Sequence, residues 1–259
     1  MPVCCPPGST GPKARDTSIP LKGAVQSMGE LEVYVTGQLS ENGLAVVVCE
    51  DIMGIDSGRT KEIADRLAVD LNCLVVLPEF LMKDTWPESY GAPGPCNFAW
   101  FIPFLRRNND KVTTKRFEDN VLPYLNAQGA KSLAWFGVCL GGCIGAALAA
   151  NSLFKCGVAC HPAFQGFGLA GGHTMDEVMS AIKGPVLYFP TVNEPKIAQP
   201  NGAVQKLIQE RAKQECLVEP YLDQVHGFVN RGDISQPSVA RDVEKVLVRA
   251  VEFIRQKAL

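Results

Sequence analysis

Short apolar runs alternate with segments of helical periodicity along most of the chain. Residues 44–49 (LAVVVC) and 74–77 (LVVL) are continuous apolar runs. They predict strands buried on both faces of a sheet, because a half-buried strand alternates apolar with polar positions. Between them, residues 57–71 repeat apolar positions at helical spacing and predict an amphipathic helix. This order is typical of a strand–helix–strand unit with parallel strands.

The same alternation continues to the C-terminus. We expect strands at residues 30–36, 44–49, 74–77, 132–136, 156–159, 185–189 and 217–222. We expect helices at residues 57–71, 98–107, 111–128 with an interruption near Pro123, 142–150, 175–182, 202–214 and 238–256. The pattern predicts an α/β fold with one mostly parallel central sheet and helices on both faces.

The first residues differ from the rest of the chain. Residues 1–22 are rich in Pro, Gly and Ser and carry no periodicity, so they predict an extended N-terminal arm. Residues 23–259 contain no linker and no internal repeat, and we expect them to form a single domain. Cys4 and Cys5 of the arm could form a lipidation or metal site, but two incidental thiols of a surface tail are the simpler interpretation.

Composition and charge argue against several classes of protein. The chain is 46% hydrophobic and 20% charged, which is typical of a globular protein, and its net charge of −2 argues against a nucleic-acid partner. No apolar run approaches the ~20 residues that span a bilayer, and no signal-peptide pattern opens the chain, so we expect no membrane partner. The ten cysteines, several within apolar strands, are expected to be reduced thiols in the cytoplasm.

One cysteine lies between two glycines where an apolar strand turns into a small-residue helix. The segment Gly137-Val138-Cys139-Leu140-Gly141 has the nucleophile-elbow pattern G-x-S-x-G with sulfur in place of the hydroxyl. A side chain at such a sharp turn needs small neighbours, and the helix that begins there turns its free N–H groups toward it. Those N–H groups lower the pKa of a thiol and stabilise an oxyanion, so Cys139 is the candidate nucleophile.

A nucleophilic cysteine needs a base, and the chain has only three histidines. His226 lies between the last strand and the last helix, where the elbow fold places its base. His161 also follows a predicted strand and could line the same cleft, although it precedes the expected acid in the sequence. His173 is expected in an exposed loop. We therefore favour His226.

An acid that orients the base is expected after the strand at 185–189. Glu194 is the only carboxylate there, and its neighbour Asn193 could orient an imidazole as well. Asp223 is close to His226 in the sequence but is more simply a solvated loop carboxylate. Asp51, Cys139 and Glu194 all follow strands, and active sites of parallel sheets lie outside the carboxyl ends of the strands.

These motifs together resemble the dienelactone hydrolase family, whose members have the α/β-hydrolase fold. The resemblance spans residues 24–256. It is carried by Phe136-Gly137-Val138-Cys139-Leu140-Gly141-Gly142, the strand and acid at 185–194, His226-Gly227-Phe228 with Arg231-Gly232, Asp51-Ile52-Met53-Gly54 and Leu77-Pro78-Glu79-Phe80.

The resemblance implies roles for individual residues. It makes Cys139 the nucleophile, His226 the base and Glu194 the acid, where the family usually has Asp. It makes the backbone N–H groups of Ile52 and Leu140 the oxyanion hole.

Three further positions match the family only in part. Asp51 matches a carboxylate, usually Glu, that contacts the resting thiol. Lys83 falls where one of two substrate-gripping arginines would be, and Arg231 lies one residue from the other. Glu50 and Arg59 could be surface or pairing residues.

The sequence therefore predicts a cysteine-dependent hydrolase of esters, lactones or related activated acyl compounds that acts through an acyl-thioenzyme. It would need no metal or other cofactor and would act on a small molecule as a monomer or homodimer. One alternative is a non-catalytic ligand-binding or regulatory protein on a hydrolase scaffold. Another is a thiol redox or metal protein using Cys139 and Cys143, although the chain contains no C-x-x-C pair.

Overall fold

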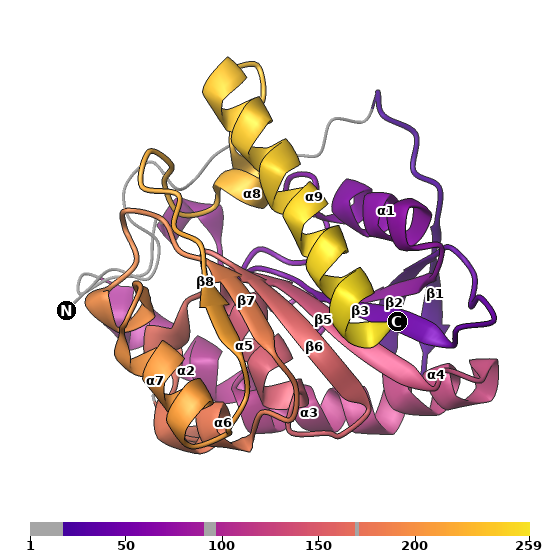
Figure 1. The fold of residues 1–259 in the computed structure, drawn as a ribbon, viewed down its shortest axis with the longest axis horizontal. Coiled ribbons are helices and arrows are strands. Elements are labelled where there is room, and N and C mark those ends of the chain that lie inside the picture. Colours follow the sequence, from indigo (N-terminus) through magenta and orange to yellow (C-terminus); the bar gives the residue numbers. More distant parts are fainter. Residues whose placement is uncertain (1–17, 91–96, 169–170) are drawn as a thin grey trace.

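The structure is a computed structural model that describes residues 18–90, 97–168 and 171–259 (Figure 1). Residues 1–17, which include Cys4, Cys5 and most of the expected N-terminal arm, lie outside the described residues. The arm therefore stays a prediction.

The described residues form an eight-stranded sheet in the order β1-β2-β4-β3-β5-β6-β7-β8. The pairs β1–β2 and β2–β4 are antiparallel and all other pairs are parallel, so the predicted mostly parallel α/β fold is confirmed. The strands are β1 (Ala24–Met28), β2 (Leu31–Thr36), β3 (Leu44–Cys49), β4 (Leu74–Pro78), β5 (Ser132–Val138), β6 (Phe154–Cys160), β7 (Val186–Phe189) and β8 (Cys216–Val218).

Helices cover both faces of the sheet. Figure 1 shows α1 and α9 crossing in front of the strands, with α3, α5 and α6 behind them. The helices are α1 (Thr60–Leu71), α2 (Phe98–Arg107), α3 (Asp110–Arg116), α4 (Leu122–Gln128), α5 (Leu140–Leu148), α6 (Met175–Ala181), α7 (Ala203–Glu210), α8 (Phe228–Arg231) and α9 (Pro237–Ala258).

The two faces of the sheet belong to two separate apolar clusters. In β3, Ala45, Val47 and Cys49 pack on the side of α5, whereas Leu44, Val46 and Val48 pack on the side of α1 and α9. All six side chains are fully buried. The continuous apolar run at 44–49 therefore corresponds to a strand covered on both faces, as predicted.

The observed elements differ from the expected ones at a few places. The edge strand β1 is an additional strand, and its residues are mostly exposed, so it lacks the apolar signal of the inner strands. β8 is shorter than the expected strand at 217–222, although a bridge between Thr191 and Tyr221 continues the pairing. The expected helix at 111–128 consists of α3, a π-helical segment at Phe117–Val121 and α4.

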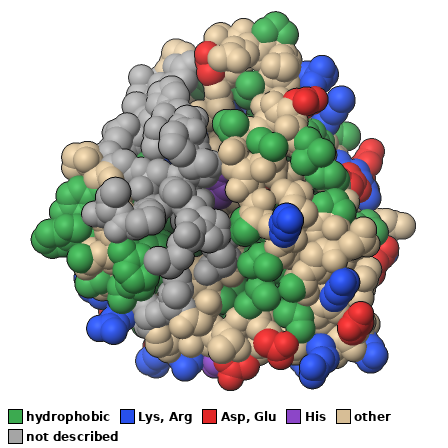
Figure 2. Space-filling model, turned by 90° about the vertical axis from the view of Figure 1, so that its left-hand side faces the viewer, with side chains coloured by type: hydrophobic (Ala, Val, Ile, Leu, Met, Phe, Trp, Pro, Cys, Tyr) green, Lys and Arg blue, Asp and Glu red, His purple; other side chains and the backbone are tan. Residues whose placement is uncertain are grey.

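Aromatic residues surround the irregular stretch after β4. Trp86 and Phe101 are buried and meet edge to face with ring centroids 5.4 Å apart, so they belong to the core. Tyr90 and Trp100 contact each other at the surface. On the face shown in Figure 2, basic and acidic side chains are interspersed around the rim.

Candidate active site

A sharp turn between β5 and α5 presents Cys139. Its φ is 55°, in the left-handed region that non-glycine residues seldom adopt. A Cβ on Gly137 would lie 2.2 Å from the carbonyl oxygen of Gly141, and a Cβ on Gly141 would lie 2.1 Å from the carbonyl oxygen of Cys49. Only glycine fits at either position, and so the two glycines of the motif allow the backbone to make this turn.

Glu194 orients the ring of His226. The imidazole Nδ1 lies 2.6 Å from Oε1 of Glu194, and both side chains are buried. The other oxygen, Oε2, accepts a hydrogen bond from the Thr191 hydroxyl at 2.6 Å and a further one from the Thr191 N–H. Both carboxylate oxygens are therefore occupied, and the ring cannot rotate without breaking a buried hydrogen bond.

Asn193, the alternative to Glu194, has a different contact. Its side-chain oxygen accepts a hydrogen bond from the backbone N–H of His226 at 3.3 Å, so it contacts the main chain and not the ring. Asp223 is exposed. Of the acids considered, the structure brings Glu194 to the imidazole.

The second side of the His226 ring faces Cys139. Burial by itself lowers the pKa of the imidazole, but the charge of Cys139 and a hydrogen bond with it, followed by Glu194, raise the pKa of His226 to about 10. A protonated ring between two negative groups explains this direction. The turn after β5 and the turn after β8 thus bring the expected nucleophile and base together.

The resemblance assigns the oxyanion hole to the backbone N–H groups of Leu140 and Ile52. Leu140 is the first residue of α5, where N–H groups have no partner within the helix. Neither its N–H nor that of Ile52 has a hydrogen-bond partner among the described residues. The carbonyl oxygen of Ile52 accepts a hydrogen bond from the N–H of Trp86 at 2.7 Å, which fixes the turn after β3.

Asp51, the carboxylate that the resemblance assigned to the thiol, is bound by several neighbouring residues. Its Oδ1 accepts from the N–H of Met53 at 2.8 Å, and its Oδ2 accepts from Ser57 and Asn230 at 2.8 Å each. The same Oδ2 lies 3.0 Å from Nε of Arg231, and both side chains are buried. Because these partners occupy both oxygens, Asp51 fixes the turn after β3 to α8.

Lys83 is not part of this group of residues. Its side chain is 68% exposed and forms an ion pair with Glu32 at 2.9 Å. A contact of Lys83 with a substrate therefore stays a prediction.

Arg231 is buried beside the expected site. Its Nε lies 3.0 Å from Asp51 and its Nη1 contacts the sulfur of Met53 at 3.7 Å. Within the described part of the chain, its Nη2 has no hydrogen-bond partner. His161 lies against His226, with ring centroids 4.8 Å apart, so the structure brings it to the expected cleft. Burial, followed by the charges of His226 and Arg231, lowers the pKa of His161 well below its ordinary value, and its ring is neutral.

Three nearby residues received no role in the site from the sequence: Thr191, Arg59 and Glu50. Thr191 anchors Glu194, and its T-x-x-E spacing is a signal that could have identified it. Arg59 donates to the carbonyl oxygen of Val229 at 2.9 Å and so holds α8. Glu50 is fully buried, and burial followed by the charge of Glu79 raises its pKa well above the ordinary value. No sequence signal distinguishes Glu50 or Arg59 from a surface residue.

The candidate site is closed. Cys139 is 0% exposed, His226 is 2% exposed and Glu194 is 6% exposed. The described cysteines other than Cys139 are buried free thiols, and burial raises the pKa of each of them: Cys49, Cys73, Cys143, Cys156, Cys160 and Cys216.

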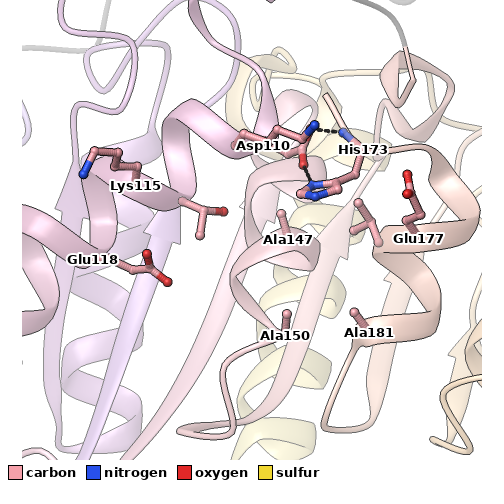
Figure 3. A pocket seen from close by; sticks show the side chains of 11 residues that line it. Asp110, Lys115, Glu118, Ala147, Ala150, His173, Glu177 and Ala181 are labelled. Atoms are coloured by element: carbon pink, nitrogen blue, oxygen red, sulfur yellow. Dashed lines mark hydrogen bonds and ion pairs between the residues drawn. The ribbon is translucent and has the colours of Figure 1, made fainter. Parts of the chain in front are cut away.

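A separate hollow of about 450 Å³ lies between α3, α5 and α6 (Figure 3). Ala147 and Ala150, near the end of α5 remote from Cys139, line it. His173 is half exposed there, and its Nδ1 lies 2.5 Å from Oδ2 of Asp110. His173 therefore belongs to a different surface from the candidate active site.

The described residues contain neither a cluster suited to a metal ion nor a helix suited to span a membrane. Nowhere in 18–90, 97–168 or 171–259 do three or more His, Cys, Asp or Glu side chains gather as a metal ion requires. None of the helices in these ranges combines the length and the apolar character needed to cross a bilayer.

Comparison with known proteins finds relatives that share much of the sequence length. The chain is 26% identical to the carboxymethylenebutenolidase homolog of Homo sapiens over 206 residues, which cover 78% of this chain and 77% of that protein. The homologous protein of Rattus norvegicus is also 26% identical, over 207 residues and with the same coverage.

Solved structures share the fold. A putative dienelactone hydrolase from Klebsiella pneumoniae superposes with a TM-score of 0.65 at 17% identity, covering 90% of this chain and 99% of that one. A dienelactone hydrolase-like promiscuous phosphotriesterase from metagenomic libraries gives a TM-score of 0.62 at 17% identity, covering 92% and 98%. These similarities place the sheet and its helices in the α/β-hydrolase fold.

The family model described as the dienelactone hydrolase family matches residues 31–258 of the chain. The match covers nearly the whole described chain and includes both turns that carry Cys139 and His226. This chain belongs to the dienelactone hydrolase family, a family of hydrolases.

Proposed function

We propose that this protein is a cysteine-dependent hydrolase of small esters, lactones or related activated acyl compounds. The observation that carries the proposal is the position of His226, whose ring is hydrogen-bonded to Glu194 on one side and interacts with Cys139 on the other. Along the chain the three residues follow the order of the elbow fold, which is nucleophile, acid and base. Family membership supports the hydrolase class, and the identity of the three catalytic residues is part of the proposal.

Acylation begins when the Cys139 sulfur attacks the carbonyl carbon of the substrate. A C–S bond forms, and the carbonyl oxygen becomes an oxyanion held by the N–H groups of Ile52 and Leu140. Each such donor contributes ~3 kcal/mol in comparable sites. Protonated His226 then gives its proton to the leaving alkoxide, and the C–O bond breaks.

Deacylation uses the ring of His226 in its neutral form. Its Nε2 takes a proton from water, and the oxygen attacks the acyl carbon. The C–S bond then breaks and the sulfur leaves as a thiolate. The proton on His226 restores the charge pair with Cys139, and the acid product departs.

This chemistry limits the substrate class. A thiolate is a good leaving group, so the first tetrahedral intermediate returns to substrate unless the alcohol portion leaves equally well. Aryl esters, enol-lactones and thioesters meet this condition, whereas amides do not. Nη2 of Arg231 has no hydrogen-bond partner among the described residues. It is therefore available to bind an acyl group that carries negative charge. The buried free thiols around the sheet suit a reducing compartment, so we infer a cytoplasmic location.

Replacement of the sulfur tests the proposal. We expect Cys139→Ala to lower the turnover of an aryl ester by at least ~1000-fold, because the remaining site cannot form a covalent intermediate. Cys216→Ala, a change at a buried thiol of the edge strand β8, is the matched control and should leave turnover unchanged. Undiminished hydrolysis by Cys139→Ala would exclude the proposed nucleophile.

A ligand-binding protein without catalysis is the second candidate. The observation that favours it is the complete burial of Cys139, since an acyl compound reaches the sulfur only after surrounding groups move. The two candidates differ in a direct measurement. A hydrolase of the proposed kind accumulates an acylated Cys139 peptide when it is quenched during turnover of an aryl ester, whereas a binding protein binds the ester without acylation.

A further inference from the structure

The ring of His161 is buried beside the candidate catalytic histidine without a hydrogen bond of its own. Its side chain is 0% exposed, and neither Nδ1 nor Nε2 has a hydrogen-bond partner among the described residues. The ring centroid lies 4.8 Å from that of His226 with an angle of 60° between the planes, and 6.0 Å from that of Phe228. The nearest ring is therefore the proposed base.

The register of the parallel strands β5 and β6 brings His161 beside Cys139, each being the residue that follows its strand. In the parallel pair β5–β6, Val138 is in register with Cys160, and the N–H of Cys139 donates to the carbonyl oxygen of Cys160 at 3.1 Å. The next residue, His161, donates its own N–H to the carbonyl oxygen of Phe189 at 2.8 Å. It is thus held between the ends of β5 and β7, close to the turn that carries the sulfur.

Two features of His161 are unfavourable for folding. Its φ of 39° is in the left-handed region, where a side chain is strained. Each buried polar atom without a hydrogen bond also destabilises the fold, because it loses its hydration without replacement. An apolar side chain, such as that of the neighbouring Phe228, avoids this second penalty. Such a position is explained most simply by a partner that is present during the reaction.

The chemistry of a neutral imidazole limits that partner. One ring nitrogen donates a hydrogen bond and the other accepts one. The two nitrogens point in different directions, so one small molecule pairs with only one of them. A carboxylate suits only the protonated nitrogen and an ammonium group only the unprotonated one, whereas an O–H group suits either. Nε2 of the neighbouring His226, the ring nitrogen that is not bound to Glu194, can take a proton from that O–H group.

We propose that His161 holds the water molecule that hydrolyses the acyl-thioenzyme. This inference rests on the proposed function and deepens it. The water gives one proton to Nε2 of His226 while its oxygen forms a bond to the acyl carbon, and the C–S bond then breaks to release Cys139. His161 gains and loses no proton in this step; it fixes the water through a hydrogen bond, so it is a catalytic residue of deacylation and not of acylation.

Rapid mixing with p-nitrophenyl acetate separates the two half-reactions, because acylation releases nitrophenol before water is needed. In His161→Phe we expect the rate of the initial burst to stay within about 3-fold of wild type, whereas steady-state turnover falls by about 100-fold, the loss expected for a misplaced reactant. Acylated Cys139 should accumulate during turnover. His161→Gln, which retains a donor and an acceptor, should recover part of the lost turnover.

The matched control is His173→Phe, the same change in the separate hollow beside Asp110, and it should alter neither phase. Equal losses in burst and turnover, or no loss in either, would overturn the inference. So would a loss confined to esters whose acyl group carries a hydroxyl, since the ring would then bind substrate. If wild type shows no burst and Cys139→Ala retains turnover, the proposed function itself fails.

Discussion

The protonation state of His226 determines the distribution of charge in the candidate site. Its pKa is raised to about 10 from the ordinary value of 6.5, because the interactions with Cys139 and Glu194 outweigh its burial. A pKa that is higher in the folded state means that protonation stabilises the fold. This contribution is complete below about pH 6.5 and is lost as the pH rises through about 10.

Glu194→Gln tests this dependence. The amide keeps the shape of the side chain but removes its charge, so the pKa of His226 should fall and the pH-dependent contribution should shrink. We expect the free energy of unfolding of wild type, relative to that of Glu194→Gln, to decrease between neutral pH and about pH 10. Urea unfolding of both proteins across this range measures the difference. A difference that grows with pH would contradict a raised pKa.

At this scale the sequence pointed to residues that the structure brings together. Cys139, His226 and Glu194 were found because each follows a strand and because the chain has few alternatives. Asp51 and Lys83 were assigned by position in the family pattern alone, and the structure shows partners that this pattern did not indicate. Arg231 pairs with one oxygen of Asp51, and Glu32 pairs with Lys83 at the surface. Such pairings join residues far apart in the sequence, and no local pattern predicts them.

The turn from β5 into α5 is the element that presents the sulfur, and its shape depends on close backbone contact. Gly141→Ala places a methyl group 2.1 Å from the carbonyl oxygen of Cys49, a backbone atom of β3. Because neither backbone can yield cheaply, we expect a loss of about 3 kcal/mol in the free energy of unfolding. In Gly166→Ala, the control, the methyl group meets no atom within 4 Å, and the change should stay below about 0.5 kcal/mol. Chemical denaturation of the two variants makes the comparison, and equal losses would contradict it.

The helices and strands show which elements the apolar pattern of the sequence predicts and which it does not. Inner strands such as β3 were predicted because burial on both faces leaves a continuous apolar run. The π-helical segment at Phe117–Val121 was not predicted, and it lies just before Pro123 near the start of α4. Proline lacks an N–H and disrupts regular helical hydrogen bonding, so an irregular turn before it is physically reasonable. The pattern indicated an interruption there but not its form.

At the scale of the whole molecule, one buried ion pair joins segments from opposite ends of the chain. Asp51 follows β3, and its partners Asn230 and Arg231 lie in α8, directly after His226. The turn that carries the N–H of Ile52 and the turn that carries the proposed base are therefore fixed to each other. The relative position of the proposed oxyanion hole and the proposed base depends on this contact.

Asp51→Asn should lower both stability and activity through this link. It leaves Arg231 buried without a charge partner, which typically costs about 3 kcal/mol. Adding Arg231→Met should restore part of the stability, because the unpaired charge is then removed, but should not restore turnover if Arg231 helps to place α8. Lys83→Gln breaks the exposed pair with Glu32 and should change neither property, since water screens that pair. Urea denaturation and aryl-ester hydrolysis of the three variants test this, and equal destabilisation by Asp51→Asn and Lys83→Gln would show that the buried pair has no special role.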